Sequence, residues 1–382
     1  MLRSTFLQGV VAAATTTTTA PIPPTQFLQQ LTLGVNVPLS GVYGSFGSEV
    51  AKGVRAAVDE TNKYNATLNK VYGVRTFDDQ NSTAIASSNV LVAAADPSIV
   101  GMIGNLTLDT TMAALPQYAN AGLAVAVPTV TGDLLTRQGY HNVFRLPATD
   151  SAEGQLFAGA VLKRRSPMRV VVVVVDKDYG LATANAFVAQ AKADKHDASL
   201  LTLEQNPDVA DSAAIIAREN PAYLFFAGRP EKLAPIAANL RSTGYTGDMG
   251  FSDSFYSADI VKPYGKELSG ALVASNLPPL DRVPSIVQYY TDFRNEVGAV
   301  TAFSTYGYAA AQLLIQAAQR ANATTRFAVL AQLQQGGSYA LMVGQYSFNP
   351  FGDALLPNIY LFTISADGFS YAKSAVPDGF VV

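Results

Sequence analysis

The chain has 382 residues, of which 49% are hydrophobic and 14% are charged, enough for two domains with large apolar cores. Its net charge of -3 at pH 7 provides no polybasic field, which argues against a nucleic-acid partner. The absence of cysteine excludes thiol catalysis, zinc–thiolate sites, iron–sulfur clusters and disulfides, and two histidines are too few for a histidine-rich metal site. We therefore expect neither a metal nor a cofactor.

The first 25 residues differ in composition from the rest of the chain. Arg3 precedes a short apolar patch over 6–14, and five threonines and the segment PIPP follow it. This order is typical of a weak secretory signal with a disordered lead-in, so we expect a periplasmic location. A disordered cytoplasmic tail is the alternative. No stretch approaches 18 consecutive apolar residues, so no membrane-spanning helix is expected.

Residues 31–62 predict a strand, a glycine-rich turn and an amphipathic helix, which together open a doubly wound α/β unit. The turn alternates glycines with aromatic residues: Gly41, Tyr43, Gly44, Phe46 and Gly47. Its G-x-x-G-x-x-G spacing differs from the G-x-G-x-x-G of dinucleotide sites, and no acidic residue follows about 20 positions later. We expect a loop whose backbone and aromatic rings approach a ligand.

Further along, eleven apolar runs of strand length alternate with alanine-rich helical stretches up to residue 364. The six valines over 170–175 have the length of a fully buried parallel strand. This βαβα alternation predicts parallel sheets with helices on both faces. Eleven strands exceed one typical sheet, so we expect an α/β protein with two doubly wound parallel-sheet lobes.

Enzymatic function is not expected. The sequence has no G-x-S-x-G motif, and neither His141 nor His196 lies in a recognisable nucleophile–base context. The neighbouring carboxylates Asp78 and Asp79 are interpreted as turn and capping residues rather than an acid–base pair.

Several segments, in order, resemble the periplasmic solute-binding proteins of the leucine/isoleucine/valine type. They are PLSGVYGSFG before the first long helix, VRTFDDQ with the strand ending in MIGN, LTRQGYHNVFR, DKDYG, and YLFFAGRPEKLAP with the following GFSD. The likeness runs from about residue 31 to 365. It implies a type I periplasmic binding protein fold, with a three-segment hinge between lobes that close around a ligand.

On this resemblance we expect residues 1–25 as the lead-in, 26–147 with 278–336 as the N-terminal lobe, and 148–277 with 337–382 as the C-terminal lobe. The implied function is that of the extracytoplasmic binding protein of an ABC importer. It would bind a small amino acid or a related organic acid or amide and deliver it to a membrane permease. A ligand-sensing regulatory domain of the same fold is the alternative.

The resemblance also implies the site. The start of a helix at Thr107 and Leu108, with Thr129 and Thr131, would bind the ligand's carboxylate. The remaining expected residues are aromatics at the cleft, Tyr43, Phe46 and Tyr179, and partners of the amino group, Arg229 and Asp253.

Two of these positions depart from the amino-acid binders. Leu108 replaces an expected serine, and Arg229 replaces a usual tyrosine. An arginine suits a carboxylate and would repel an ammonium, but it could also simply pair with Asp253. The sequence therefore leaves open whether the ligand is an amino acid or an organic acid.

Overall fold

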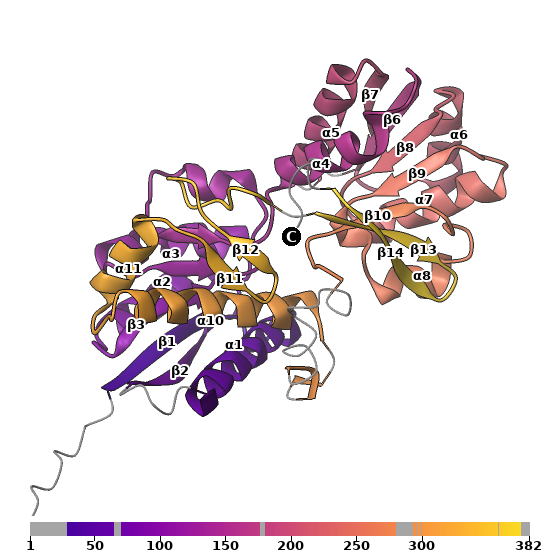
Figure 1. Cartoon of the computed structure of the whole chain (residues 1–382). Coiled ribbons are helices and arrows are strands. Elements are labelled where there is room, and N and C mark those ends of the chain that lie inside the picture. The colour runs from indigo at the N-terminus through magenta and orange to yellow at the C-terminus, as the bar shows by residue number, and fades with distance from the viewer. Residues whose placement is uncertain are drawn as a thin grey trace, which may run out of the picture.

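The computed structural model describes residues 29–64, 70–175, 180–279, 293–295, 297–298, 300–357 and 359–375. Two lobes, each built around its own β-sheet, lie side by side (Figure 1). The expected two-lobe α/β architecture is confirmed.

The first lobe has a five-stranded parallel sheet with the order β2-β1-β3-β4-β5. Its strands are β1 (Gln29–Val37), β2 (Lys70–Asp78), β3 (Ile99–Gly104), β4 (Val125–Val127) and β5 (Val143–Arg145). Its helices are α1 (Gly44–Tyr64), α2 (Thr83–Ala94), α3 (Leu108–Asn120), the 3-10 helix η1 (Asp133–Arg137), α10 (Ala302–Arg320) and α11 (Arg326–Gln334). Helices α1 and α10 pack together over one face of this sheet, and α2 and α3 pack over the other.

The second lobe has a sheet with the order β14-β13-β10-β9-β8-β6-β7. Its strands are β6 (Arg169–Val174), β7 (Asp197–Thr202), β8 (Tyr223–Phe226), β9 (Asp248–Phe251), β10 (Leu272–Ser275), β13 (Tyr360–Ser365) and β14 (Gly368–Ser374). Its helices are α4 (Asp150–Leu162), α5 (Leu181–Ala193), α6 (Val209–Arg218), α7 (Pro230–Ser242), the 3-10 helix η2 (Asp253–Phe255) and α8 (Ala258–Tyr264). Strand β13 runs antiparallel to both of its neighbours, so this sheet is mixed rather than wholly parallel.

The valine run shows how the sheet of the second lobe is buried on both sides. Val171 and Val173 belong to the core under α6 and α7, whereas Val170, Val172 and Val174 belong to the core under α4 and α5. Side chains alternate between the two faces of a strand, so an unbroken apolar run is stable only when helices cover both faces.

The chain passes between the lobes three times. The first passage covers 146–149, between β5 and α4, and the second follows Ser275 at the end of β10. The third comes before β13. It was expected near 336–338, with residues 337–382 in the second lobe, and this boundary needs correction.

Residues after Gly336 remain in the first lobe. The hairpin of β11 (Tyr339–Leu341) and β12 (Gly344–Tyr346) contributes buried side chains to the core of that lobe. A bridge between Arg145 and Asp353 holds the following segment there as well. Gly336 has a φ of +80°, the left-handed conformation that commonly ends a helix, so the glycines mark the end of α11 rather than a passage between lobes.

Candidate ligand-binding site

The predicted site residues within the described chain all follow the carboxyl ends of strands. In parallel sheets, ligands bind beyond these ends, at the point where the strand order reverses. That point lies between β1 and β3 in the first lobe and between β6 and β8 in the second. Tyr43 and Phe46 follow β1, Thr107 and Leu108 follow β3, Thr129 and Thr131 follow β4, Arg229 follows β8 and Asp253 follows β9. Tyr179 lies outside the described residues.

The loop after β3 leads into α3 and leaves the start of that helix open. Thr107 is the N-cap residue, but its side chain makes no capping bond. Its hydroxyl donates to Asn81 Oδ1 at 2.9 Å and contacts Thr110 Oγ1 at 2.8 Å. Because the first N–H groups of a helix have no intrahelical partner, this end of α3 suits an anion such as a carboxylate. Leu108 is partly buried and packs with the core between α2 and α3.

A buried polar network fixes the loop before α3. The amide nitrogen Nδ2 of Asn105 donates to Asp79 Oδ2 at 2.8 Å, and Tyr118 donates to Asn105 Oδ1 at 3.2 Å. The Thr129 hydroxyl donates to the carbonyl of Leu106 at 2.8 Å. Thr129 thus joins the loop after β4 to the loop after β3, and its hydroxyl already has a protein acceptor.

The Asp78–Asp79 pair has the structural role expected for it. Asp78 Oδ1 accepts from the backbone N–H of Leu39 at 2.8 Å, and Oδ2 accepts from the Ser40 hydroxyl at 2.6 Å. Asp79 is fully buried, and burial raises the pKa of its carboxyl. Together they hold the loops after β1 and β3.

Three carboxyl groups gather at the facing end of the second lobe, and we call them the carboxylate cluster: Asp150, Glu153 and Asp253. Glu153 Oε1 accepts from the backbone N–H of Asp253 at 2.9 Å. Asn276, which follows β10, donates from Nδ2 to Asp253 Oδ2 at 2.9 Å. The segment between β10 and the first lobe therefore fixes the carboxyl group of Asp253.

Burial raises the pKa of all three carboxyls. It raises the pKa of Asp150 to about 6, with Asp253 and Asp133 adding repulsion and a hydrogen bond from Thr131 opposing the shift. It also raises the pKa of Glu153 and of Asp253. Repulsion from Asp253 and Asp150 adds to the effect of burial on Glu153, so the three carboxyls together disfavour a full set of negative charges.

Thr131 touches both lobes. Its carbonyl accepts from the backbone N–H of Asp150, in the second lobe, at 3.0 Å and from Arg145 Nη1 at 3.0 Å. Arg145 is fully buried and forms an ion pair with Asp353, with Nε 2.9 Å from Oδ1. A single guanidinium thus ties the loop after β4 to the segment that follows β12 in the first lobe.

Arg229 is the N-cap residue of α7, and its side chain is 47% exposed. Its Nη1 atom lies 3.8 Å from Glu231 Oε1. Asp253, the partner considered for it from the sequence, has its contacts to Glu153 and Asn276.

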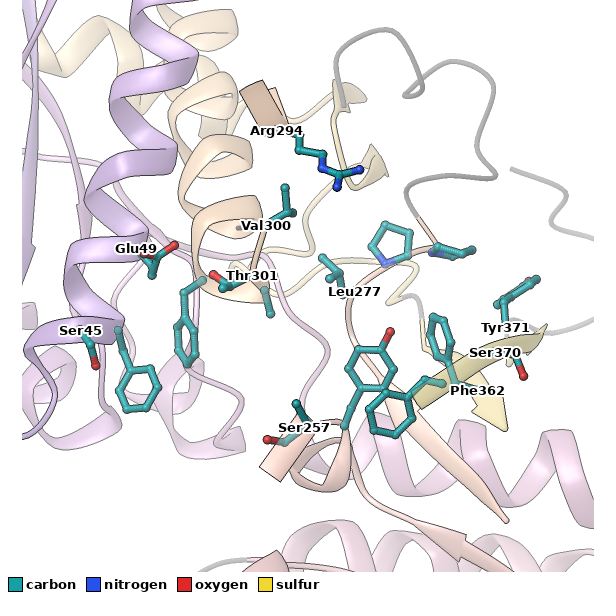
Figure 2. Close-up of a pocket in the computed structure, with 18 residues that line it drawn as sticks. Ser45, Glu49, Ser257, Leu277, Arg294, Val300, Thr301, Phe362, Ser370 and Tyr371 are labelled. Carbon is teal, nitrogen blue, oxygen red and sulfur yellow. The ribbon is translucent and has the colours of Figure 1, made fainter. Parts of the chain in front are cut away.

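A groove of about 1050 Å³ lies between the lobes, and Figure 2 shows its two sides. Of the predicted residues, Phe46 lines it; Tyr43, Thr107, Leu108, Thr129, Thr131, Arg229 and Asp253 do not. Helix α1 begins at Gly44, inside the segment expected to be a turn, so Phe46 lies in its first turn. The Phe46 ring centroid lies 6.4 Å from that of Tyr43 and 4.9 Å from that of Phe303.

Sequence reasoning missed Asp150, Glu153, Asn276 and Phe303. The two acidic residues fall in the first turn of α4, where acids usually interact favourably with the helix dipole at the surface. From the sequence alone, Asp150 and Glu153 would be interpreted as surface residues at the start of a helix. Only the neighbouring loop after β9 reveals that Glu153 is buried beside a second carboxyl.

Among the residues that the structure describes, no group of three or more histidines, cysteines and acidic residues could hold a metal ion. No helix there is both long and apolar enough to cross a membrane.

Residues 30–368 match the family model described as periplasmic binding protein. The chain is 24% identical over 344 residues to the Leu/Ile/Val-binding protein homolog 1 of Brucella melitensis, covering 88% of this chain and 91% of that protein. It is 26% identical over 336 residues to the Leu/Ile/Val-binding protein BraC3 of Rhizobium johnstonii, covering 85% and 88%.

Solved structures share the fold. An ABC transporter substrate-binding protein from Desulfitobacterium hafniense, in complex with Leu, has a TM-score of 0.76 at 22% identity and covers 90% of this chain and 100% of its own. A solute-binding protein of an ABC transporter from R. palustris, in complex with benzoate, has a TM-score of 0.70 at 18% identity and covers 91% and 97%.

Proposed function

Because the chain belongs to the periplasmic binding protein family, we propose that it is the extracytoplasmic solute-binding subunit of an ABC importer, and that its solute is an amino acid held between the lobes. The observation that carries the choice of solute is a pairing of opposite polarity. The first lobe offers the open N-terminus of α3, and the second offers the carboxylate cluster.

In this proposal the ligand's carboxylate accepts hydrogen bonds from the first N–H groups of α3, beside Thr107, Thr129 and Thr131. Its ammonium group binds Asp253, with Glu153 and Asp150 adding negative charge. Burial makes the charged form of each carboxyl unfavourable, so a cation that restores charge balance gains free energy there.

Transport requires that the ligand change the shape that a permease meets. A ligand shifts an open–closed equilibrium only through a difference in its affinity for the two states. An amino acid bound at both ends would touch both lobes and favour closure. Family membership and the similarity to Leu/Ile/Val-binding proteins support transport over regulation as the role of this closure.

The test compares an amino acid with the two related compounds that lack either its amino group or its carboxylate. Isothermal titration with leucine or phenylalanine, with the same molecules lacking the amino group, and with those lacking the carboxylate should give binding only for the complete amino acids. Small-angle scattering should show a smaller radius of gyration with the bound amino acid.

Equal affinity for the acid that lacks an amino group would indicate an organic-acid binder and a role for Arg229. No binding by any amino acid would refute the proposed ligand class. An unchanged radius of gyration at saturation would argue against a transport role.

A further inference from the structure

The inter-lobe groove is walled by aromatic rings from both lobes, and we infer that the solute carries a large aromatic side chain that occupies it. This inference rests on the proposed amino-acid function and adds to it the class of side chain. It also assigns side-chain selection to Phe303 and Tyr256, which the sequence did not single out.

The first lobe contributes two rings that pack on each other at the edge of the groove. Phe46 and Phe303 have ring centroids 4.9 Å apart at an interplanar angle of 38°. Phe46 is 41% exposed, so part of its ring is available to contact a ligand. A ligand ring placed here would bury this surface.

The second lobe contributes a cluster of aromatic rings centred on Tyr256. Its ring centroid lies 4.7 Å from that of Phe362 and 4.4 Å from that of Phe369. Figure 2 shows Phe362 and Tyr371 on one side of the groove and Ser45 and Thr301 on the other. Aromatic pairs prefer tilted or offset contacts, and both walls offer ring edges and faces for them.

The groove adjoins the proposed ammonium site through two short links. Tyr256 donates its backbone N–H to the carbonyl of Asp253 at 2.9 Å. Asn276, which holds the Asp253 carboxyl, precedes Leu277, and Leu277 lines the groove. An amino acid bound at Asp253 would therefore direct its side chain along this wall.

The size and polarity of the groove are compatible with a large ring. About 1050 Å³ leaves room for a bulky aromatic side chain between the two walls. The groove also includes Glu49, whose Oε2 atom is buried and, among the described residues, has no hydrogen-bond partner. A ring with a donor, such as an indole N–H or a phenol, would satisfy this oxygen.

The test keeps the head group constant and varies the side chain. Isothermal titration of the whole protein with alanine, valine, leucine, phenylalanine and tryptophan should give an affinity for the two aromatic amino acids about tenfold or more above that for valine. Phe303→Ala should reduce the affinity for phenylalanine and tryptophan about tenfold and change that for alanine less than twofold.

A second variant of Phe303 and a control variant at another position accompany this measurement. Phe303→Leu, which retains an apolar side chain, should lose the aromatic preference without loss of thermal stability. Phe327→Ala is the matched control, because Phe327 lies on α11 of the same lobe, is 64% exposed and does not line the groove. It should bind every ligand as the unaltered protein does.

Valine or leucine binding as tightly as phenylalanine would overturn this inference and leave the amino-acid function in place. So would an equal loss for alanine and phenylalanine in Phe303→Ala. If no amino acid binds, the proposed function itself fails, and this inference fails with it.

Discussion

The two lobes build their facing edges in different ways. The first lobe uses backbone N–H groups at the start of α3 and holds the preceding loop with a buried network of Asn105, Asp79 and Tyr118. The second lobe uses the side chains of Asp150, Glu153 and Asp253, all with raised pKa values. One edge therefore favours an anion and the other a cation.

Side-chain substitutions are therefore expected to affect the two edges differently. A backbone anion site depends on the position of a loop, so single side-chain changes weaken it only indirectly. A side-chain cation site depends on individual charges and can be removed by one substitution.

The largest effect is expected for Asp253→Asn. The substitution keeps the size of the side chain and removes its charge, so amino-acid binding should weaken by about 2–5 kcal/mol, as when one partner of a buried charge pair is lost. Isothermal titration measures this. Asp197→Asn is the matched control, because Asp197 is exposed at the amino end of β7, the opposite edge of the same sheet. Equal losses in both variants would contradict the assignment of Asp253.

The ligand-free protein should lose stability as the pH rises from about 4 to about 6. The pKa of Asp150 is raised from 3.8 to about 6, so the folded protein holds a proton that the unfolded chain releases in this window. The free energy of unfolding therefore falls with rising pH, by at most about 3 kcal/mol for this group. Urea unfolding at several pH values measures the slope, which Asp150→Asn should reduce. The same slope in the unaltered protein and in Asp150→Asn would contradict the raised pKa of Asp150.

Thr129→Val tests the anion edge. It removes the hydroxyl that donates to the Leu106 carbonyl at 2.8 Å and leaves that carbonyl without this partner. A lost hydrogen bond of this kind costs about 1 kcal/mol, so amino-acid affinity should fall several-fold as the loop before α3 loosens. Isothermal titration with the amino acid measures the loss. An unchanged affinity would contradict a carboxylate site at this loop.

The smallest effect is expected for Arg229→Ala. The Arg229 side chain is 47% exposed and lies 3.8 Å from Glu231, and exposed ion pairs contribute little. Amino-acid affinity should change by less than about 0.5 kcal/mol. A large loss in titrations with an organic acid would instead place a second carboxylate near α7.

The sequence predicted the local structure well where burial is complete. The valine run forms strand β6 with almost the expected bounds, because an unbroken apolar run leaves few alternatives. Strands of three residues, such as β5 and β12, carry too little periodicity to be predicted. The end of the first lobe was misplaced because Gly336 and Gly337 signal a turn but not which lobe the chain enters next.

The candidate site likewise has features that the local sequence determines and features that only tertiary packing determines. The sequence determined the strand–turn–helix segments that bring Thr107, Thr129 and Asp253 to the carboxyl ends of their strands, because side-chain periodicity and turn residues are local properties. Tertiary structure alone decided that Glu153 is buried against Asp253 and that Phe303 meets Phe46. These pairs lie 100 and more than 250 residues apart in the chain, and their contact arises from the packing of whole helices and loops that no local pattern encodes.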